Sequence, residues 1–294
     1  MTRATTLREA LPNRRVEAWK YSDLRAALAD GPHVLHEGRD IIERLAPGVQ
    51  RHDIAAGETR LVVERMDDDA HLDARSFEWT LGENAALTRV VIQTGAGEPL
   101  AMARARLARG AKFRQFILAE GARLARIETH VAVAGEGAQV ELNGIYMVGE
   151  GRHADLTSVV SHDVAGAVTR QLIKGVARKG GRGVFQGKIH VAHGAQQTDA
   201  RQHHAALMLE EGAEIDAKPE LEIYADDVQC AHGNAIGALD DAQLFYARAR
   251  GIPEAEARAM LVEAFLVEAV PEHLSEELRA EILDRIGSWL RGRP

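Results

Sequence analysis

The sequence predicts a mainly β protein in which short coils of chain stack into a β-solenoid, with a helical region at each end. Short runs rich in Val, Ile, Leu and Thr recur between about residues 57 and 237, and several alternate apolar with polar residues, as half-buried strands do. Gly–Ala pairs separate many of the runs, and helix-length amphipathic patterns are nearly absent there. Coils too thin to bury their own face must stack on one another. The pattern therefore favours a solenoid over a β-sandwich, which also has short strands at regular intervals.

The N-terminal region, residues 1–56, is predicted to form short helices joined by irregular links. Val16, Trp19 and Leu24 are apolar at spacings close to those of one helix face. Ser22 is a residue type that caps helices, and we expect it to cap the turn that begins with Asp23.

The β-solenoid core is predicted to span residues 57–237. Ala138–Leu142 shows the apolar–polar alternation clearly. The predicted strands include Leu61–Val63, Thr88–Ile92, Phe113–Leu118, Ile127–Val133, Gln139–Leu142, Leu156–Val160 and Leu221–Tyr224. We expect the small-residue pairs to lie at corners between strands, namely Gly110–Ala111, Gly121–Ala122, Gly137–Ala138, Gly194–Ala195 and Gly212–Ala213.

The C-terminal region, residues 238–294, is predicted to be helical. Asp240 can cap a first helix that runs to Arg250 and ends before Gly251. Pro253 suits the first turn of a second helix, and a third runs from about Ser275 to Leu290. The apolar stripes of the last two helices are Leu261, Phe265 and Ala269, then Leu278, Ile282, Ile286 and Trp289.

Composition and charge exclude several classes of protein. Of the 294 residues, 46% are hydrophobic, so the chain has enough apolar material to fold and is not expected to be disordered. The formal net charge of −8 repels phosphate backbones, so we expect no nucleic-acid partner. No apolar stretch is long enough for a membrane span, and the N-terminus lacks the apolar segment of a secretory signal. With a single cysteine and no possible intramolecular disulfide, a cytoplasmic location is expected.

Cys230 and His232 are the strongest candidate metal ligands. They are two residues apart, and on a strand that spacing points both side chains to the same side. A thiolate beside an imidazole is a plausible soft metal-binding pair, in which the imidazole is expected to lower the pKa of the thiol. The alternative is a small buried cysteine next to a histidine with ordinary hydrogen bonds, and spacing alone does not decide between the two.

Other chemical motifs are weak or missing. There is no P-loop, no G-x-G-x-x-G between a strand and a helix and no G-x-S-x-G, so no catalytic residue is predicted. His203 and His204 are adjacent, and on a strand at most one of them faces any given site; neither is given a role.

The segment from Lys218 to Ile252, KPELEIYADDVQCAHGNAIGALDDAQLFYARARGI, carries a specific resemblance. It is similar to the C-terminal signature of the SufB/SufD family of iron–sulfur cluster assembly scaffold proteins. The N-terminal element RVEAWKYS, from Arg15 to Ser22, resembles an N-terminal element of the same family. The segments Gly187–Ile189 and Ala195–Ala200 resemble strand segments of the family.

The resemblance implies a right-handed parallel β-helix with flanking helical regions, in a non-catalytic scaffold subunit. It implies a SufB-like scaffold subunit and a SufC-like ABC ATPase as partners, with a transient iron–sulfur cluster at the junction with the SufB-like subunit and no cofactor bound stably by this chain alone. His232 matches the family's interface histidine and has Cys230 as its neighbour. The residues placed near the ATPase contact are Leu244, Phe245, Tyr246 and Arg250.

The chain is shorter than typical family members, which implies fewer coils and a reduced N-terminal region. In isolation it could pair with itself through an exposed strand edge.

Two hypotheses that assign the chain to other functional classes stay open at this point. A β-helical carbohydrate-active enzyme resembling polysaccharide lyases could recruit Asp226, Asp227 and Lys188, although the chain is poor in the aromatic residues on which sugars stack. A plain structural β-helix that homodimerises would leave Cys230 and His232 merely packed.

Overall fold

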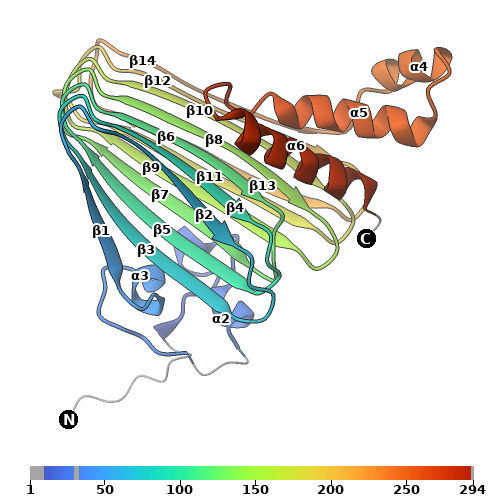
Figure 1. The fold of residues 1–294 in the computed structure, drawn as a ribbon, viewed down its shortest axis with the longest axis horizontal. Helices are drawn as coiled ribbons and strands as arrows, with labels where there is room; N and C mark the ends of the chain where they lie inside the picture. The colour runs from blue at the N-terminus through green and yellow to red at the C-terminus, as the bar shows by residue number, and fades with distance from the viewer. Residues whose placement is uncertain (1–9, 30–32, 293–294) are drawn as a thin grey trace.

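The computed structural model describes residues 10–29 and 33–292 and shows a β-solenoid built from two parallel sheets (Figure 1). Strands alternate between the sheets along the chain, so each coil contributes one strand to each. Within the described residues each sheet has seven strands, in the orders β1-β3-β5-β7-β9-β11-β13 and β14-β12-β10-β8-β6-β4-β2. We call the first sheet A and the second sheet B. Every ladder within them is parallel and joins a strand to the next but one, which confirms the predicted solenoid and excludes the sandwich.

The strands have the following bounds. Sheet A contains β1 (Val49–Ile54), β3 (Leu72–Leu81), β5 (Glu98–Leu107), β7 (Ala125–Val133), β9 (His153–His162), β11 (Arg182–Val191) and β13 (Glu214–Ile223). Sheet B contains β2 (Thr59–Met66), β4 (Ala86–Gln93), β6 (Lys112–Ala119), β8 (Gln139–Val148), β10 (Val168–Ala177), β12 (Asp199–Met208) and β14 (Gln229–Gly237). The first strand, β1, lies within the N-terminal region for which only short helices were expected.

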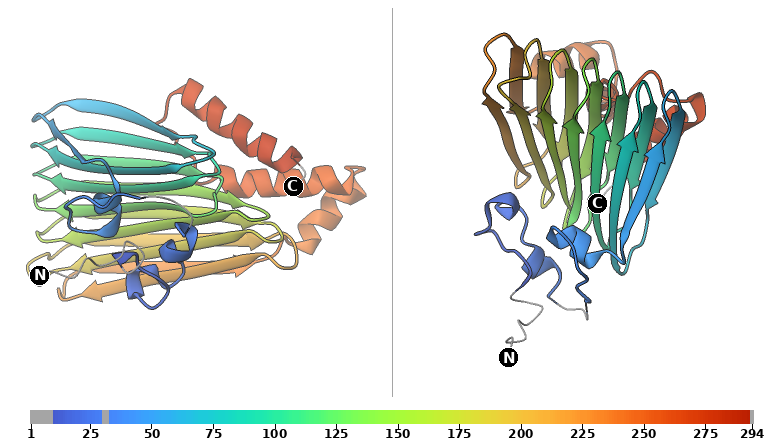
Figure 2. Two further views of the ribbon diagram at one scale, coloured as in Figure 1. Left: turned by 90° about the horizontal axis from the view of Figure 1, so that it is seen from below. Right: turned by 90° about the vertical axis from the view of Figure 1, so that its left-hand side faces the viewer.

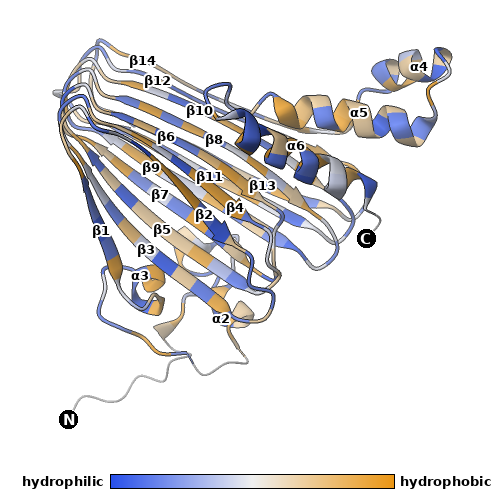
Figure 3. Ribbon diagram, viewed as in Figure 1, coloured by the Kyte–Doolittle hydropathy of each residue, from blue (hydrophilic) through white to orange (hydrophobic). Residues whose placement is uncertain are grey.

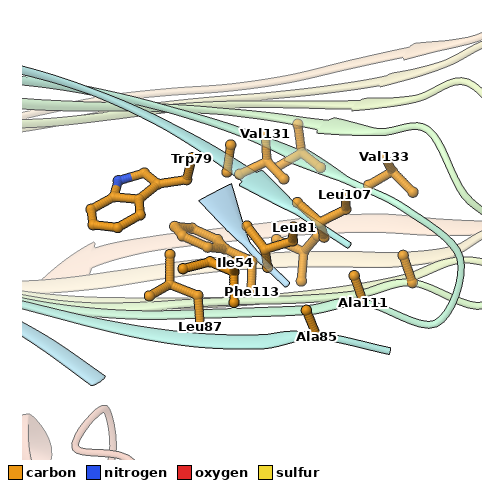
Figure 4. Packing of buried hydrophobic residues seen from close by; sticks show 14 of the residues in the cluster. Ile54, Trp79, Leu81, Ala85, Leu87, Leu107, Ala111, Phe113, Val131 and Val133 are labelled. Carbon is orange, nitrogen blue, oxygen red and sulfur yellow. The ribbon is translucent and has the colours of Figure 1, made fainter. Parts of the chain in front are cut away.

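The core fills the space between the two sheets. Inward-facing apolar residues from successive coils stack there, as Figure 4 shows for Trp79, Leu81, Leu107 and Phe113. Figure 3 shows the corresponding alternation of hydrophobic and hydrophilic bands along the strands. The predicted Gly–Ala pairs do lie between strands, and their glycines at 110, 121, 137 and 212 have positive φ, which a residue with a side chain adopts only with strain.

The N-terminal helices cover part of the outer face of sheet A. They are η1 (Glu17–Trp19), α2 (Leu24–Ala27) and α3 (Ile41–Leu45). Their buried side chains pack against Leu100 and Met102 of β5. The prediction that Ser22 caps the following helix is wrong, because Asp23 caps α2 by accepting a hydrogen bond from the backbone N–H of Ala26 (2.9 Å). Ser22 is fully buried and donates to Asp155 Oδ2 of sheet A (2.5 Å).

Three C-terminal helices follow the last strand: α4 (Asp241–Ala249), α5 (Glu254–Val267) and α6 (Glu276–Arg291). Asp240 caps α4 as predicted, and Pro253 is the N-cap of α5, one position before the expected first turn. Apolar side chains of α5 and α6, including Leu266 and Ile282, pack on the outer face of sheet B. The N-terminal and C-terminal helices therefore lie on opposite sides of the solenoid, and α4 extends beyond the sheets against α5 (Figures 1 and 2).

No helix among the described residues is both long enough and apolar enough to cross a membrane.

Candidate functional site

The last coil leaves one end of the solenoid open. Among the described residues, β13 and β14 are the terminal strands of their sheets, and each is paired on one side only, with β11 and β12 respectively. All residues of β14 are at least partly exposed, whereas Ala200, Gln202, His204 and Ala206 on the inward face of β12 are buried. The open end therefore presents an unpaired strand edge together with side chains that point toward the core.

Cys230 and His232 lie on the same, inward side of β14. In the parallel register Cys230 is paired with Ala200 and His232 with Gln202, and both of these β12 residues are buried in the interior. Cys230 packs against the apolar cluster that contains Ala200 and Ala225, and it is half-buried, whereas His232 is exposed. The structure thus brings the two predicted ligands to one side of the rim of the solenoid.

The thiol of Cys230 is not activated in this chain. Burial raises its pKa, and the nearby charge of Asp199 raises it further, against the lowering effect of a backbone hydrogen bond from Ala200. The expectation that the imidazole of His232 lowers the pKa of Cys230 is therefore wrong: burial dominates. Metal binding at Cys230 would have to displace a proton from the sulfur.

His204 lies in the interior beside this pair, although the sequence assigned it no role. It is fully buried, and burial lowers its pKa to about 4. Its ring bridges Asn234 Oδ1 on β14 (2.7 Å, from Nδ1) and the hydroxyl of Tyr146 on β8 (3.0 Å, at Nε2). Since an amide oxygen only accepts, Nδ1 carries the proton and Nε2 accepts from Tyr146. This chain of hydrogen bonds anchors β14 to the core. Adjacent His203 lies on the opposite, outer side, as the strand period predicts.

Gln202 is the register partner of His232, and no role for it was predicted from the sequence. Its side chain crosses the interior, where Nε2 donates to the backbone oxygen of Gly187 on sheet A (3.3 Å). Gly187 makes this approach possible, because a Cβ there would lie 2.6 Å from that nitrogen. The only sequence signal was position: Gln202 and His204 share the strand face of buried Ala200.

The residues expected near an ATPase contact lie on α4, with Arg250 at its C-cap. Phe245 is 73% and Tyr246 59% exposed, and the guanidinium of Arg250 sits 3.5 Å above the Tyr246 ring. Leu244 is only 6% exposed, so it supports α4 from beneath and is not part of the surface.

The residues suggested for a carbohydrate-active site are not drawn into one cluster. Lys188 forms its ion pair with Glu222 (2.7 Å) on the outer face of sheet A. Asp226 and Asp227 lie in the turn between β13 and β14. Within the described part of the chain, no group of three or more His, Cys, Asp or Glu side chains is arranged to hold a metal ion.

A family model for the core domain of SufBD proteins of the SUF system for FeS cluster assembly matches residues 49–265. The chain belongs to the SufBD family. The match begins at β1 and ends within α5, so it includes the open end, Cys230, His232 and all of α4.

Several curated proteins are similar to this SufBD chain. The iron–sulfur cluster assembly protein SufD of Escherichia coli is 32% identical over 245 residues, which cover 82% of this chain and 58% of that protein. Protein ABCI7, chloroplastic, of Arabidopsis thaliana is 37% identical over 58% of this chain and 36% of its own length. A SufBD family protein of Mycobacterium tuberculosis is 29% identical over 77% of this chain and 59% of its own length. The chain thus spans less than two thirds of each of these relatives.

Proposed function

We propose that this chain is a non-catalytic scaffold subunit of iron–sulfur cluster assembly that supplies Cys230 and His232 as two ligands to a nascent cluster. The observation that carries the proposal is the position of both side chains on the same side of β14, at the open rim of the solenoid. Membership of the SufBD family supports the same chemistry. The proposed setting is a reducing compartment such as the cytoplasm, where Cys230 stays a thiol.

A second subunit is required to complete the cluster site. Iron–sulfur clusters usually take about four protein ligands, and this pair offers two. The free edges of β13 and β14 are suited to pairing with strands of another chain, which would bring further ligands to the same rim. We assign this place to a SufB-like scaffold subunit. A second copy of this chain would compete for the same edge when the protein is alone.

A SufC-like ABC ATPase is the proposed partner of α4. Phe245 and Tyr246 are large exposed side chains on one short helix, and aromatic residues often anchor protein interfaces. Arg250 stacks on Tyr246 and adds a cationic group to the same surface. In this proposal ATP hydrolysis belongs to the partner.

A mechanical connection from α4 to the solenoid supports this arrangement. α4 packs on α5, and α5 packs on sheet B through Val262 and Leu266. The ammonium of Lys174 on β10 lies 4.2 Å from the centre of the Phe265 ring and forms an ion pair with Glu268 Oε2 (2.7 Å). A displacement of α4 by the ATPase would thus be transmitted to the sheet that ends in β14.

Reconstitution with SufB-like and SufC-like partners tests the proposal. His232→Ala should abolish cluster formation in the complex, measured by the visible absorbance of the cluster, while the fold and the mass of the complex stay unchanged. His203→Ala is the matched control, because His203 lies on the outer face of the neighbouring strand. Full cluster yield from His232→Ala would remove this residue from the mechanism and overturn the proposal.

A further inference from the structure

Gln202 lies directly beside His232 on the inward face of the open end. The two residues are register partners on β12 and β14, and neighbouring strands are about 4.8 Å apart. The next inward register pair, two residues further along the same strands, is His204 and Asn234. His204 Nδ1 lies 2.7 Å from Asn234 Oδ1. Inward side chains at equal register on β12 and β14 therefore come within hydrogen-bonding reach of each other.

The side-chain amide of Gln202 is held in one orientation, and its oxygen accepts no hydrogen bond from the described residues. Nε2 donates to the carbonyl oxygen of Gly187, and a flipped amide would place two acceptor oxygens against each other. The side chain is 2% exposed, and its Oε1 atom is buried without a hydrogen-bond partner among the described residues. A buried acceptor of this kind is unfavourable unless a donor reaches it.

His232 offers that donor. A neutral imidazole carries one N–H and one nitrogen with a free lone pair, and only the latter can bind a metal. We propose that Gln202 is a positioning residue: its Oε1 accepts the ring N–H of His232 and thereby selects the tautomer whose other nitrogen is free for the nascent cluster. The proposed hydrogen bond rests on the strand register and on the unpaired Oε1 of Gln202, whereas its role in assembly rests on the function proposed above. Histidine ligands in metal sites typically donate their second nitrogen in this way.

Gln171 provides a matched control. It is the register neighbour of Gln202 one coil earlier, on β10, and it is also buried. Its Nε2 donates to Ser158 Oγ (2.7 Å), and its Oε1 also has no partner among the described residues. Gln171→Met therefore removes the same chemistry from the same interior row, one coil away from His232.

The first test uses nitrogen-15 NMR of the histidine rings in the full chain without partners. In the wild type we expect His232 in a single tautomer with a hydrogen-bonded ring N–H. Gln202→Met should give the tautomer mixture of a water-exposed histidine, and Gln171→Met should leave the spectrum of His232 unchanged. An unchanged tautomer in Gln202→Met overturns the proposal.

The second test measures the rate of cluster assembly in the complex with SufB-like and SufC-like partners. Removing such a supporting hydrogen bond typically costs about 10–100-fold, so Gln202→Met should slow assembly at least tenfold and Gln171→Met by no more than about twofold. If His232→Ala abolishes assembly while Gln202→Met assembles at the wild-type rate, the positioning role is overturned and the proposed function stands. If His232→Ala itself assembles clusters normally, the proposed function fails, and the role of Gln202 in assembly fails with it.

Discussion

The indole of Trp19 lies against the guanidinium of Arg126, with the guanidinium carbon 4.2 Å from the centre of the ring. Arg126 is buried on the outer face of β7 and forms ion pairs with Asp155 and Glu128, both at 2.8 Å. Ser22 donates to the same Asp155. Two residues of the N-terminal RVEAWKYS element therefore close over a buried charge cluster and attach the N-terminal helices to sheet A.

Trp19→Ala should detach this region. Removing a buried indole typically costs about 3–5 kcal/mol of stability and here also uncovers Arg126. We expect a loss of this size in urea unfolding, together with rapid proteolysis in the N-terminal region. Val16→Ala is the control, because Val16 is exposed and should change stability by less than about 0.5 kcal/mol. Equal behaviour of the two variants would contradict the attachment.

Acid should destabilise the protein through two buried histidines, His162 and His204, and the partly buried His153. Burial lowers the pKa of His153, His162 and His204 to about 4 each, whereas unfolded histidine titrates near 6.5. Between about pH 6.5 and pH 4 the unfolded chain binds protons that the folded chain excludes, so the free energy of unfolding falls as the pH falls through this window. Below about pH 4 this contribution levels off.

Urea unfolding measured between pH 7 and pH 4.5 checks this dependence. His204→Gln should reduce the slope by up to about 1.4 kcal/mol per pH unit, which is the contribution of one proton. Tyr146→Phe removes the hydrogen bond to His204 without removing a histidine, so it should lower stability evenly across the range. A wild-type slope in His204→Gln would show that His204 is not excluded from protonation.

Glycines on β10 and β11 make room for Tyr146. A Cβ on Gly175 would lie 1.9 Å from the Tyr146 ring, and one on Gly183 would lie 2.2 Å from it. Either glycine-to-alanine change should cost about 1–3 kcal/mol or more by overpacking. Gly149→Ala is the control, since a Cβ there has no atom within 4 Å. Thermal unfolding that is unchanged in Gly183→Ala would contradict this packing.

The surface of α4 should matter for partner binding and not for folding. Because Phe245 and Tyr246 are exposed, replacing both with alanine should leave the unfolding transition unchanged. The double variant should bind a SufC-like ATPase at least about 30-fold more weakly, which corresponds to the loss of about 2 kcal/mol or more at an interface anchor. Titration calorimetry checks this, with exposed Leu61→Ala on β2 as the control. Wild-type affinity of the double variant would show that the ATPase does not dock on α4.

Local sequence patterns anticipated much of the architecture, since strand alternation, corner glycines and helix caps are set by nearby residues. Asp240 and Ser275 were expected at helix starts and are caps in the structure. Ser22 has equally good capping chemistry, yet it faces Asp155, which lies far along the chain. Its neighbour Asp23 caps the helix instead. Local helix-capping propensity does not predict the hydrogen bond from Ser22 to the buried carboxylate of Asp155.

The candidate site was likewise predicted only in part from local sequence patterns. The two-residue spacing of Cys230 and His232 was enough to predict a shared side, because the strand period is local. The raised pKa of Cys230 depends on how deeply the thiol is buried against the cluster that contains Ala200, and the sequence pattern did not show this.

By itself, the sequence determined that this chain forms stacked coils with helical ends, and which residues of each strand share a face. Only the tertiary structure decided that Gln202 stands beside His232, that His204 reaches both Tyr146 and Asn234, and that Trp19 covers Arg126. The reason is that side-chain alternation repeats every two residues along one strand. Register between coils, in contrast, depends on the length of every intervening turn, and it exists only once the strands have paired.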